Sequence, residues 1–494
     1  MAIQRRTVLA MAGAAALAAG GLGVGAFLRS GEARPSSPTT RERVTYEGWL
    51  QRRTVPYFIA HRGAGIVVPE HTLSSYQTAL DWGAAAIEIS VVRSADDEVY
   101  CLHDLTLDRT TTATGPANEK SAEFLDEVRV SIPRLGPRWV GANMPVLPRL
   151  TDVLRAIGGR AVLCLEAKDD DAYPLMTKIV EESGLKDTVM IKLPGSATAR
   201  LEVAKNAGYP IYAYLGSPAE ATAAAIDKLG KLLDPKLDAL VLPARAEWDL
   251  FPTALIRRAV DTGVPVWAVP VYRRAEVQQL TLLGVQGIVT PDLGYLSGAQ
   301  APLTADVWAE GAISAGEITL DPFSDKYSLH WDEQGVIGLD VPNRHAFVSL
   351  GQFCPIVATS YRLAFDAAFD PMPTDTSQHL SIAFGHADDR YYEHQSANAD
   401  GYHAQLGADG RMAIYAHVQG NPNGQALTAS QQGTPFKSGL WSRLILEVTP
   451  ATMRLTRDDR TFVQAQDDRF RGGYLHIGRS GNDGKLKIRN LKIT

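Results

Sequence analysis

Two histidine-containing pairs are the residues of this sequence whose types could carry out acid–base chemistry. His61 with Arg62 directly follows a short apolar run, and His103 with Asp104 follows another. Histidine exchanges a proton near neutral pH, so two of them can serve as base and acid. Arginine carries a planar fork of donors that suits a phosphate group. The two pairs together predict proton transfer at a phosphate ester.

Three glutamates and a lysine add the charges that such a reaction needs. Glu70 lies shortly after the first histidine pair, Glu88 lies within a second apolar run, and Glu166 ends a third. Carboxylates hold a hard divalent cation through oxygen. Lys168, two residues beyond Glu166, can neutralise a phosphate. We therefore expect attack at a phosphodiester, with a metal ion and basic side chains sharing the developing charge.

A parallel barrel is the fold that would bring these residues to one place. Over residues 56–298, short apolar runs alternate with helical patterns, which indicates a parallel sheet with helical crossovers. At about 250 residues, a TIM-type (β/α)8 barrel fits best, with its chemistry at the carboxyl ends of the strands. The strand-like runs are residues 57–60, 86–92, 99–102, 161–165, 188–193, 211–215, 239–242, 264–269 and 287–290. They exceed the eight barrel places by one, so one run is peripheral or misread.

One link between two of these runs is too short for a parallel crossover. Val91 and Val99 are joined only by a polar turn, whereas a parallel connection needs about a dozen residues or more. The two runs are therefore expected to form an antiparallel hairpin. If Ala95-Asp96 is the loop, Glu88 lies opposite His103, and a slip of one residue would break that pairing.

The rest of the chain divides into a C-terminal domain and an N-terminal leader. Residues 303–494 carry short alternating segments separated by turns such as Asn482-Asp483-Gly484, which predicts an all-β antiparallel sandwich. Arg5-Arg6 before an Ala- and Gly-rich apolar run predicts a twin-arginine-type signal peptide over residues 1–33. An uncleaved membrane anchor is the alternative. Residues 34–55 are polar with prolines and are assigned to a linker and lead-in.

Composition excludes several classes of function. The 494 residues carry a formal net charge of −6, so there is no global electrostatic case for a nucleic-acid partner. The cysteines, Cys101, Cys164 and Cys354, form no C-x-x-C pair, which argues against a zinc knuckle or a thioredoxin-type centre. Cys101 and Cys164 lie in apolar runs, where free thiols are usually buried.

The chemical residues lie in motifs that resemble the glycerophosphodiester phosphodiesterase family. The motifs are H-R-G-x(5)-P-E-H-T from residue 61, G-A-A-A-I-E-I-S from residue 83, H-D-L-T-L-D-R-T-T from residue 103 and L-E-A-K from residue 165. The resemblance covers residues 56–295 and implies a TIM barrel that uses a divalent cation, with Ca²⁺ favoured over Mg²⁺. It implies an acid–base pair of His61 and His103, substrate contacts from Arg62, Lys168 and Trp267, metal ligands at Glu88, Ser90 and Glu166, and support from Glu70 and Asp104.

The sequence departs from the family's pattern in three places. The family's Glu-x-Asp is Glu88-Ile89-Ser90, its P-E-N-T asparagine is His71, and the asparagine after its tryptophan strand is Pro270. Losing one carboxylate lowers the charge of a cation site, and ligand charge sets calcium affinity. Three interpretations stay open: a weakened metal site helped by water or Asp104, a different metal, and an inactive scaffold.

Each of these residues also has a plainer interpretation. His61 and His103 would then be structural, and the strand-end glutamates would pair with Arg62 and Lys168 in ordinary ion pairs. Trp267 would be core packing, and His71 would be a surface residue at a helix start.

We therefore predict an exported phosphodiesterase that cleaves glycerol- or polyol-linked phosphodiesters, either glycerophosphodiesters or wall teichoic acid. It would be secreted or associated with the cell wall. A phospholipase D-like activity on lysolipids is one alternative. A catalytically inactive barrel that serves as a cell-wall glycan-binding module is another. The C-terminal domain weakly resembles laminin-G or concanavalin-like lectins, so a wall glycan or teichoic acid is its candidate partner.

Overall fold

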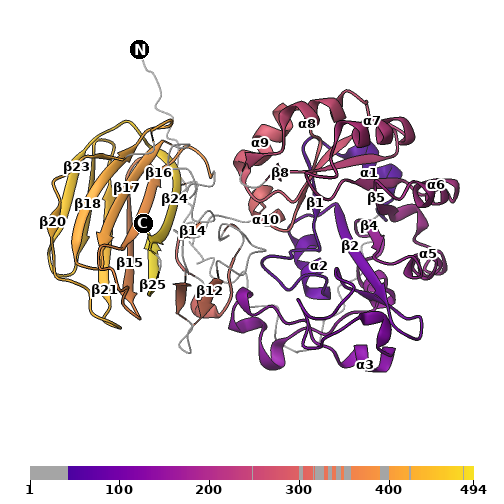
Figure 1. Ribbon diagram of the computed structural model, residues 1–494, viewed down its shortest axis with the longest axis horizontal. Helices are drawn as coiled ribbons and strands as arrows, with labels where there is room; N and C mark the ends of the chain where they lie inside the picture. The colour runs from indigo at the N-terminus through magenta and orange to yellow at the C-terminus, as the bar shows by residue number, and fades with distance from the viewer. Residues whose placement is uncertain are drawn as a thin grey trace, which may run out of the picture. The chain divides into compact units, whose positions relative to one another are not determined.

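The computed structural model describes residues 43–494 except 247–248, 300–303, 307, 315, 317–327, 332–335, 341–345, 350–355, 357, 390–399, 422–423 and 482 (Figure 1). The expected signal peptide, the first part of the expected linker and Cys354 lie outside the described residues. Within the described part of the chain, no helix has the length and apolar character needed to cross a membrane.

Eight parallel strands form a closed barrel at the centre of the first domain. The strands are β1 (Tyr57–Ala60), β2 (Ala86–Arg93), β4 (Val162–Ala167), β5 (Val189–Pro194), β6 (Ile211–Tyr214), β7 (Ala239–Pro243), β10 (Val266–Val269) and β11 (Gly287–Thr290). They follow the order β1-β11-β10-β7-β6-β5-β4-β2, and β1 pairs with β2 to close the ring. The TIM-type barrel predicted from the alternation is confirmed.

Helices cover the outside of the barrel, as Figure 1 shows for α5 to α9. The longer crossover helices are α2 (Leu73–Asp81), α4 (Leu150–Ile157), α5 (Ala172–Glu182), α6 (Thr198–Asn206), α7 (Ala223–Leu232), α8 (Thr253–Val260) and α9 (Arg274–Leu282), and the short α10 (Leu293–Leu296) follows β11. Helix α2 begins where Thr72 Oγ1 accepts a hydrogen bond from Ser75 N, 3.1 Å away. The helices bury their apolar sides against outward-facing strand residues such as Ile87 and Leu163.

The inside of the barrel is filled by a second, separate cluster of side chains. Trp267 lies at its centre and packs edge-on against Tyr57 and Tyr212. Helix α1 (Tyr46–Arg52) adds Trp49, whose ring centroid lies 6.1 Å from that of Trp267. Tyr46 and Trp49 are therefore part of the barrel's core, and residues 46–52 are a helix and not a linker, which corrects our assignment. Their aromatic side chains carry too much apolar area to stay in solvent.

The short strand β3 (Val99–Cys101) is the peripheral ninth run, and it pairs with β2 antiparallel. The hairpin is confirmed, but its register is shifted by one residue: Val91 pairs with Cys101, and Leu102 N bonds Ser90 O. Glu88 is therefore not opposite His103 as we expected. The turn is wider than a two-residue loop, because Ser94 N bonds Glu98 O and encloses three residues.

Residues 103–149 form an insertion with a small core of its own. It contains α3 (Ala122–Glu127) and the 3₁₀ turns η2 (Ala117–Glu119), η3 (Pro133–Leu135), η4 (Pro137–Trp139) and η5 (Gly141–Asn143). Leu102, Leu107 and Leu125 are among its buried residues. The sequence pattern did not predict this insertion as a unit.

The C-terminal domain consists of antiparallel sheets around one apolar core, as expected for a sandwich. One sheet contains β12 (Ser328–Trp331), β13 (Ile337–Asp340), β25 (Lys485–Ile493), β15 (Tyr361–Phe369), β21 (Ser442–Val448), β22 (Thr452–Arg457) and β23 (Phe462–Gln466). The other contains β14 (Ala346–Ser349), β24 (Gly472–Ser480), β16 (His379–Gly385), β17 (Gly401–Gly407), β18 (Arg411–His417), β19 (Gln425–Ala426) and β20 (Gln431–Gln432).

Candidate active site

Strand alternation delivers the polar side chains to the interior of the barrel at one end. In β2, β4 and β5, the residues two positions before Glu88, Glu166 and Lys192 belong to the apolar interior cluster. Every second residue of a strand faces the same side, so these three side chains face inward one layer closer to the carboxyl ends. His61 follows β1 by the same rule, two residues after the interior residue Ile59.

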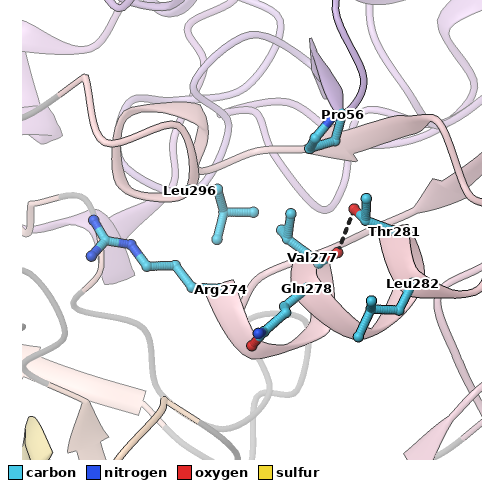
Figure 2. Close-up of a pocket in the computed structure, with 7 residues that line it drawn as sticks. All are labelled: Pro56, Arg274, Val277, Gln278, Thr281, Leu282 and Leu296. Carbon is cyan, nitrogen blue, oxygen red and sulfur yellow. Dashed lines mark hydrogen bonds between the residues drawn. The ribbon is translucent and has the colours of Figure 1, made fainter.

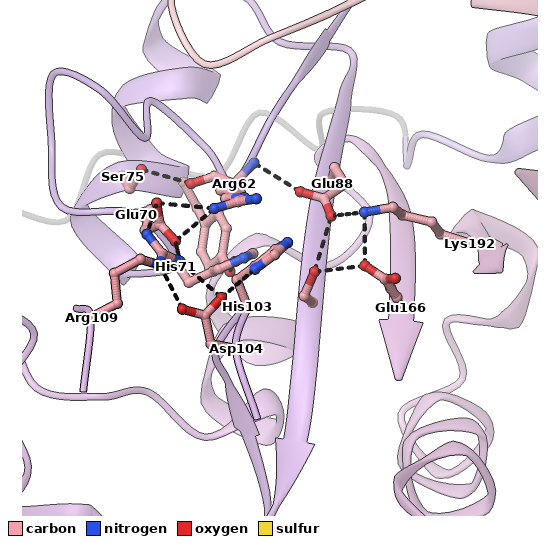
Figure 3. Close-up of polar contacts among 12 residues, drawn as sticks. Arg62, Glu70, His71, Ser75, Glu88, His103, Asp104, Arg109, Glu166 and Lys192 are labelled. Atoms are coloured by element: carbon pink, nitrogen blue, oxygen red, sulfur yellow. Dashed lines mark hydrogen bonds and ion pairs between the residues drawn. The ribbon is translucent and has the colours of Figure 1, made fainter. Parts of the chain in front are cut away.

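The centre of the site is a buried lysine held between two glutamates (Figure 3). Lys192 Nζ lies 2.7 Å from Glu88 Oε1 and 2.7 Å from Glu166 Oε2. Ser90 Oγ approaches the same two oxygen atoms, at 3.1 and 3.0 Å. The prediction that Glu88, Ser90 and Glu166 share one site is thus matched by the geometry, with Lys192 between them.

The outer oxygens of both glutamates also accept hydrogen bonds. Glu88 Oε2 accepts from the backbone N–H of Arg62 at 3.0 Å. Glu166 Oε1 accepts from Tyr214 Oη at 2.7 Å and lies 3.3 Å from Lys168 Nζ. Each carboxylate oxygen of the pair therefore has at least one donor among the described residues.

The charges of this centre stabilise one another. Burial alone would raise the pKa of Glu166, but Lys192 and Lys168 outweigh it and lower the pKa to about 2. Glu88 behaves alike: against the effect of burial, Lys192 and His61 hold its pKa well below the usual range. Burial would lower the pKa of Lys192, yet the two carboxylates raise it. All three groups are ionised at neutral pH.

The first histidine pair lies on a tight turn beside this centre. Arg62 has a left-handed φ of 56°, and its carbonyl accepts a hydrogen bond from Ser75 Oγ at 3.1 Å. Gly63 follows with a φ of 76°, and a Cβ there would lie 2.5 Å from Ser75 Oγ, so only glycine fits. His61 is buried, and burial and Arg62 lower its pKa well below the usual value.

The second histidine is held by a carboxylate on the insertion. His103 Nδ1 lies 2.6 Å from Asp104 Oδ1, which leaves Nε2 as the free ring nitrogen of a partly exposed side chain. Burial lowers the pKa of His103, while the bond to Asp104 acts in the opposite direction. Arg62, the residue after His61, and Asp104, the residue after His103, are linked through Glu70 and Arg109.

An arginine that we did not predict ties the two histidine segments together. Arg109 Nη2 lies 2.8 Å from Glu70 Oε1, and Arg109 Nε lies 2.5 Å from Asp104 Oδ2. Glu70 also binds Arg62 Nη1 at 3.0 Å, so its carboxylate is shared by two guanidinium groups. Burial would raise the pKa of Glu70, but these arginines hold it far below its usual range. Glu70 and Asp104 are thus supporting residues, as expected.

The structure contradicts two expectations, that His71 is a surface residue and that Trp267 contacts substrate. His71 is buried and not a surface residue: its Nδ1 lies 2.9 Å from Tyr76 Oη, and burial lowers its pKa to about 3. Trp267 does not line the site, because it is fully buried in the interior cluster and donates to Tyr57 Oη at 2.7 Å. Tyr57 begins β1 whereas His61 follows it, so this bond lies at the other end of that strand.

The strongest signal that we missed is Lys192. It interrupts an apolar run over residues 188–193, and burying a lysine is costly unless an acidic partner waits inside. Its position two residues after Met190, which faces the interior, would have placed it there. Tyr214 follows the same logic in β6. For Arg109, no local signal distinguishes it from an exposed arginine.

An apolar pocket on α9 does not belong to this site. Figure 2 shows it on α9, lined by Pro56, Arg274, Val277, Gln278, Thr281, Leu282 and Leu296. None of the residues of the lysine–glutamate centre or the histidine pairs lines it. We assign it no part in the chemistry.

The barrel half of this chain is similar to known proteins. The model of the Glycerophosphoryl diester phosphodiesterase family matches residues 61–294. A glycerophosphodiester phosphodiesterase of Caldanaerobacter subterraneus is 26% identical over 244 residues, which cover 47% of this chain and 93% of that protein. One of Bacillus subtilis is 33% identical over 125 residues, 24% of this chain and 42% of the relative.

This chain thus spans less than half of the Bacillus relative and nearly all of the Caldanaerobacter one. A solved glycerophosphodiester phosphodiesterase from Agrobacterium tumefaciens has a TM-score of 0.37 at 23% identity, covering 48% of this chain and 97% of that one. From the family match, residues 61–294 form a domain of the glycerophosphoryl diester phosphodiesterase family, a domain of the phosphoric diester hydrolase type.

Proposed function

We propose that this protein hydrolyses a glycerol- or polyol-linked phosphodiester to a phosphomonoester and an alcohol. The observation that carries the proposal is the set of contacts that joins both histidine segments to one ionic centre. Arg62 N donates to Glu88, and Arg109 binds both Glu70 and Asp104. Two imidazoles beside fixed positive charge are the groups that a phosphodiester needs for proton transfer and charge neutralisation.

The environments of the two histidines suggest which is the base and which the acid. His61 is buried beside Arg62 and is neutral at pH 7, so it can accept a proton from the attacking hydroxyl. Asp104 stabilises a protonated His103, so this ring can donate a proton to the leaving oxygen. The new O–P bond forms as the old one breaks, and the phosphate ends with the same charge on a monoester. The nucleophile is water or a neighbouring hydroxyl of the substrate, which would first give a cyclic phosphate.

The basic residues would bind the phosphate. Arg62 is anchored by Glu70, and Lys168 borders Glu166, so both cations are fixed before substrate arrives. The sequence-based expectation of a Ca²⁺ on Glu88, Ser90 and Glu166 remains a competing prediction.

The cellular setting is part of the proposal. The twin-arginine-type leader suggests export, and an exported hydrolase with an added β domain would suit deacylated phospholipids or a wall polymer such as teichoic acid. A wall glycan or teichoic acid is the candidate partner of the C-terminal domain.

Release of glycerol 3-phosphate from glycerophosphodiesters by the purified full chain tests the reaction. His61→Ala and His103→Ala should each lower kcat by about 10²-fold or more, whereas His379→Ala on β16 should not. Turnover that survives both barrel substitutions would refute the acid–base assignment. Release of free choline from a lysolipid would favour the phospholipase D-like alternative. Absence of turnover on all these substrates would favour an inactive, glycan-binding module.

A further inference from the structure

We propose that the ammonium group of Lys192 is the resident cation of this active site and occupies the place expected of a divalent metal ion. The inference concerns the barrel site only. Its catalytic part rests on the proposed phosphodiesterase function, whereas its structural part does not.

The first argument is the position of the ammonium. Lys192 Nζ makes 2.7 Å contacts with one oxygen of Glu88 and one of Glu166, two carboxylates on the neighbouring strands β2 and β4. This is the point from which a metal ion would have to contact both. Lys192 is itself buried, so its ammonium is not a mobile surface charge that happens to approach.

The second argument is the state of the carboxylate oxygens. Ser90 Oγ adds its hydroxyl to the same inward oxygens, and the outward oxygens accept from Arg62 N and Tyr214 Oη. A metal ligand must direct a lone pair at the ion, and on both inward oxygens the ammonium of Lys192 already takes such a direction, while the single Ser90 proton can go to either one. Ser90, which stands where a third carboxylate would add charge, supplies a hydroxyl that donates.

The third argument is the charge balance. Two carboxylates face two ammonium groups, since Lys168 Nζ lies 3.3 Å from Glu166 as well. Calcium sites keep an excess of negative ligand charge, and this centre has none to spare. Among the described residues, no group of three or more His, Cys, Asp and Glu side chains is arranged to hold a metal ion. The residues present therefore do not fit a divalent cation.

The ammonium can serve the reaction directly. Two of its three protons point to carboxylates, and the third can be donated to a phosphate oxygen. Glu88 joins Lys192 to the first histidine segment, because its other oxygen accepts from the backbone N–H of Arg62, the residue after His61. A fixed cation beside the reacting phosphate neutralises its developing charge without any exchange of ligands.

Metal binding tests the structural part without reference to turnover. Equilibrium dialysis with Ca²⁺ and with Mg²⁺ should give no binding to the wild-type barrel site, whereas Ser90→Asp/Lys192→Ala should bind Ca²⁺. The double variant restores a third carboxylate and removes the ammonium. Calcium that binds wild type and is lost in Glu166→Gln would overturn the inference, and so would a folded double variant that binds none.

Turnover tests the catalytic part. Wild-type hydrolysis of glycerophosphodiesters should be unchanged by a chelator. Lys192→Met should lower kcat by about 10²-fold or more, while Lys178→Met, an exposed lysine on α5, should match wild type. Hydrolysis that requires an added divalent ion would overturn this inference and leave the proposed function standing. If wild type hydrolyses nothing, the proposed function fails, and dialysis alone decides the place of Lys192.

Discussion

Asp104→Asn removes the charge of the carboxylate that holds the second histidine and that also binds Arg109. Asp104 Oδ1 lies 2.6 Å from His103 Nδ1, a charge-assisted bond when the ring is protonated. Asparagine has nearly the same shape but no charge, so the imidazolium loses its partner. A hydrogen bond to a charged group contributes about 1.5–3 kcal/mol, and 1.36 kcal/mol corresponds to about one pKa unit. The pKa of His103 should therefore fall by about 1–2 units.

His103 is proposed to act as the acid, so a lower pKa of its ring should reduce the rate at alkaline pH. The ring must carry a proton to donate it, and a lower pKa leaves it deprotonated over more of the neutral range. The alkaline limb of the kcat/KM profile should move to lower pH by about 1–2 units, and the rate at pH 8 should fall by about 10-fold to 100-fold.

The measurement is the pH profile of glycerophosphodiester hydrolysis by wild type, Asp104→Asn and Asp81→Asn. Asp81 is an exposed aspartate at the end of α2 and serves as the matched control. Equal thermal stability of the three proteins would exclude unfolding as the cause. An alkaline limb that stays in place in Asp104→Asn, with only KM changed, would refute the assignment of His103 as the acid.

Three further substitutions test the fold around the site. Trp267→Phe leaves the buried Tyr57 hydroxyl without its indole partner and should lower the free energy of unfolding by about 1–3 kcal/mol, measured by urea denaturation, with KM unchanged; a raised KM would show that Trp267 meets substrate after all. Gly63→Ala should abolish most turnover in a still-folded protein, because its Cβ would collide with Ser75; full activity would contradict the geometry. His386→Gln tests a buried histidine next to β16 of the C-terminal domain. Burial lowers the pKa of His386 from 6.5 to about 4, so the unfolded chain binds more protons than the native domain below pH 6.5. The free energy of unfolding of the wild type should therefore fall by about 3 kcal/mol as pH falls to 4. The free-energy gap between wild type and His386→Gln should narrow over that range in thermal denaturation, and a constant gap would argue against a neutral buried ring.

The barrel could be predicted because its signal is local. Apolar runs alternate with amphipathic segments, and the short link between Val91 and Val99 identified the antiparallel pairing of β3 with β2. The register of that pair could not be predicted. The hydrogen bond between Ser94 N and Glu98 O sets the length of the turn, and no residue type in the turn indicates this length. Helix α1 was missed because Tyr46 and Trp49 lie among polar residues, in a stretch that we assigned to a linker and lead-in.

The candidate site was predictable wherever a residue ended a strand. His61 and Glu166 needed only the rule that parallel strands end at one edge, whereas Glu88 lies within β2 and was singled out by the family motif. Lys192 required a second rule, the alternation of inward and outward side chains along β5. We assigned the apolar run to a strand but did not consider where its single charged side chain would lie. Trp267 misled because its type suits a substrate platform, whereas its depth in the strand puts it among core residues.

The two histidines of the site lie in parts of the domain that differ in local stability, because His103 lies on the insertion after β3 and His61 follows a barrel strand. His103 and Arg109 are held by a small apolar cluster that includes Leu102 and Leu107, whereas His61 and Lys192 belong to the closed barrel. A minor cluster opens more readily than a large one. Mild heat or denaturant should therefore displace His103 first. The barrel would remain folded, with His61 and Lys192 in place, but the protein would no longer hydrolyse substrate.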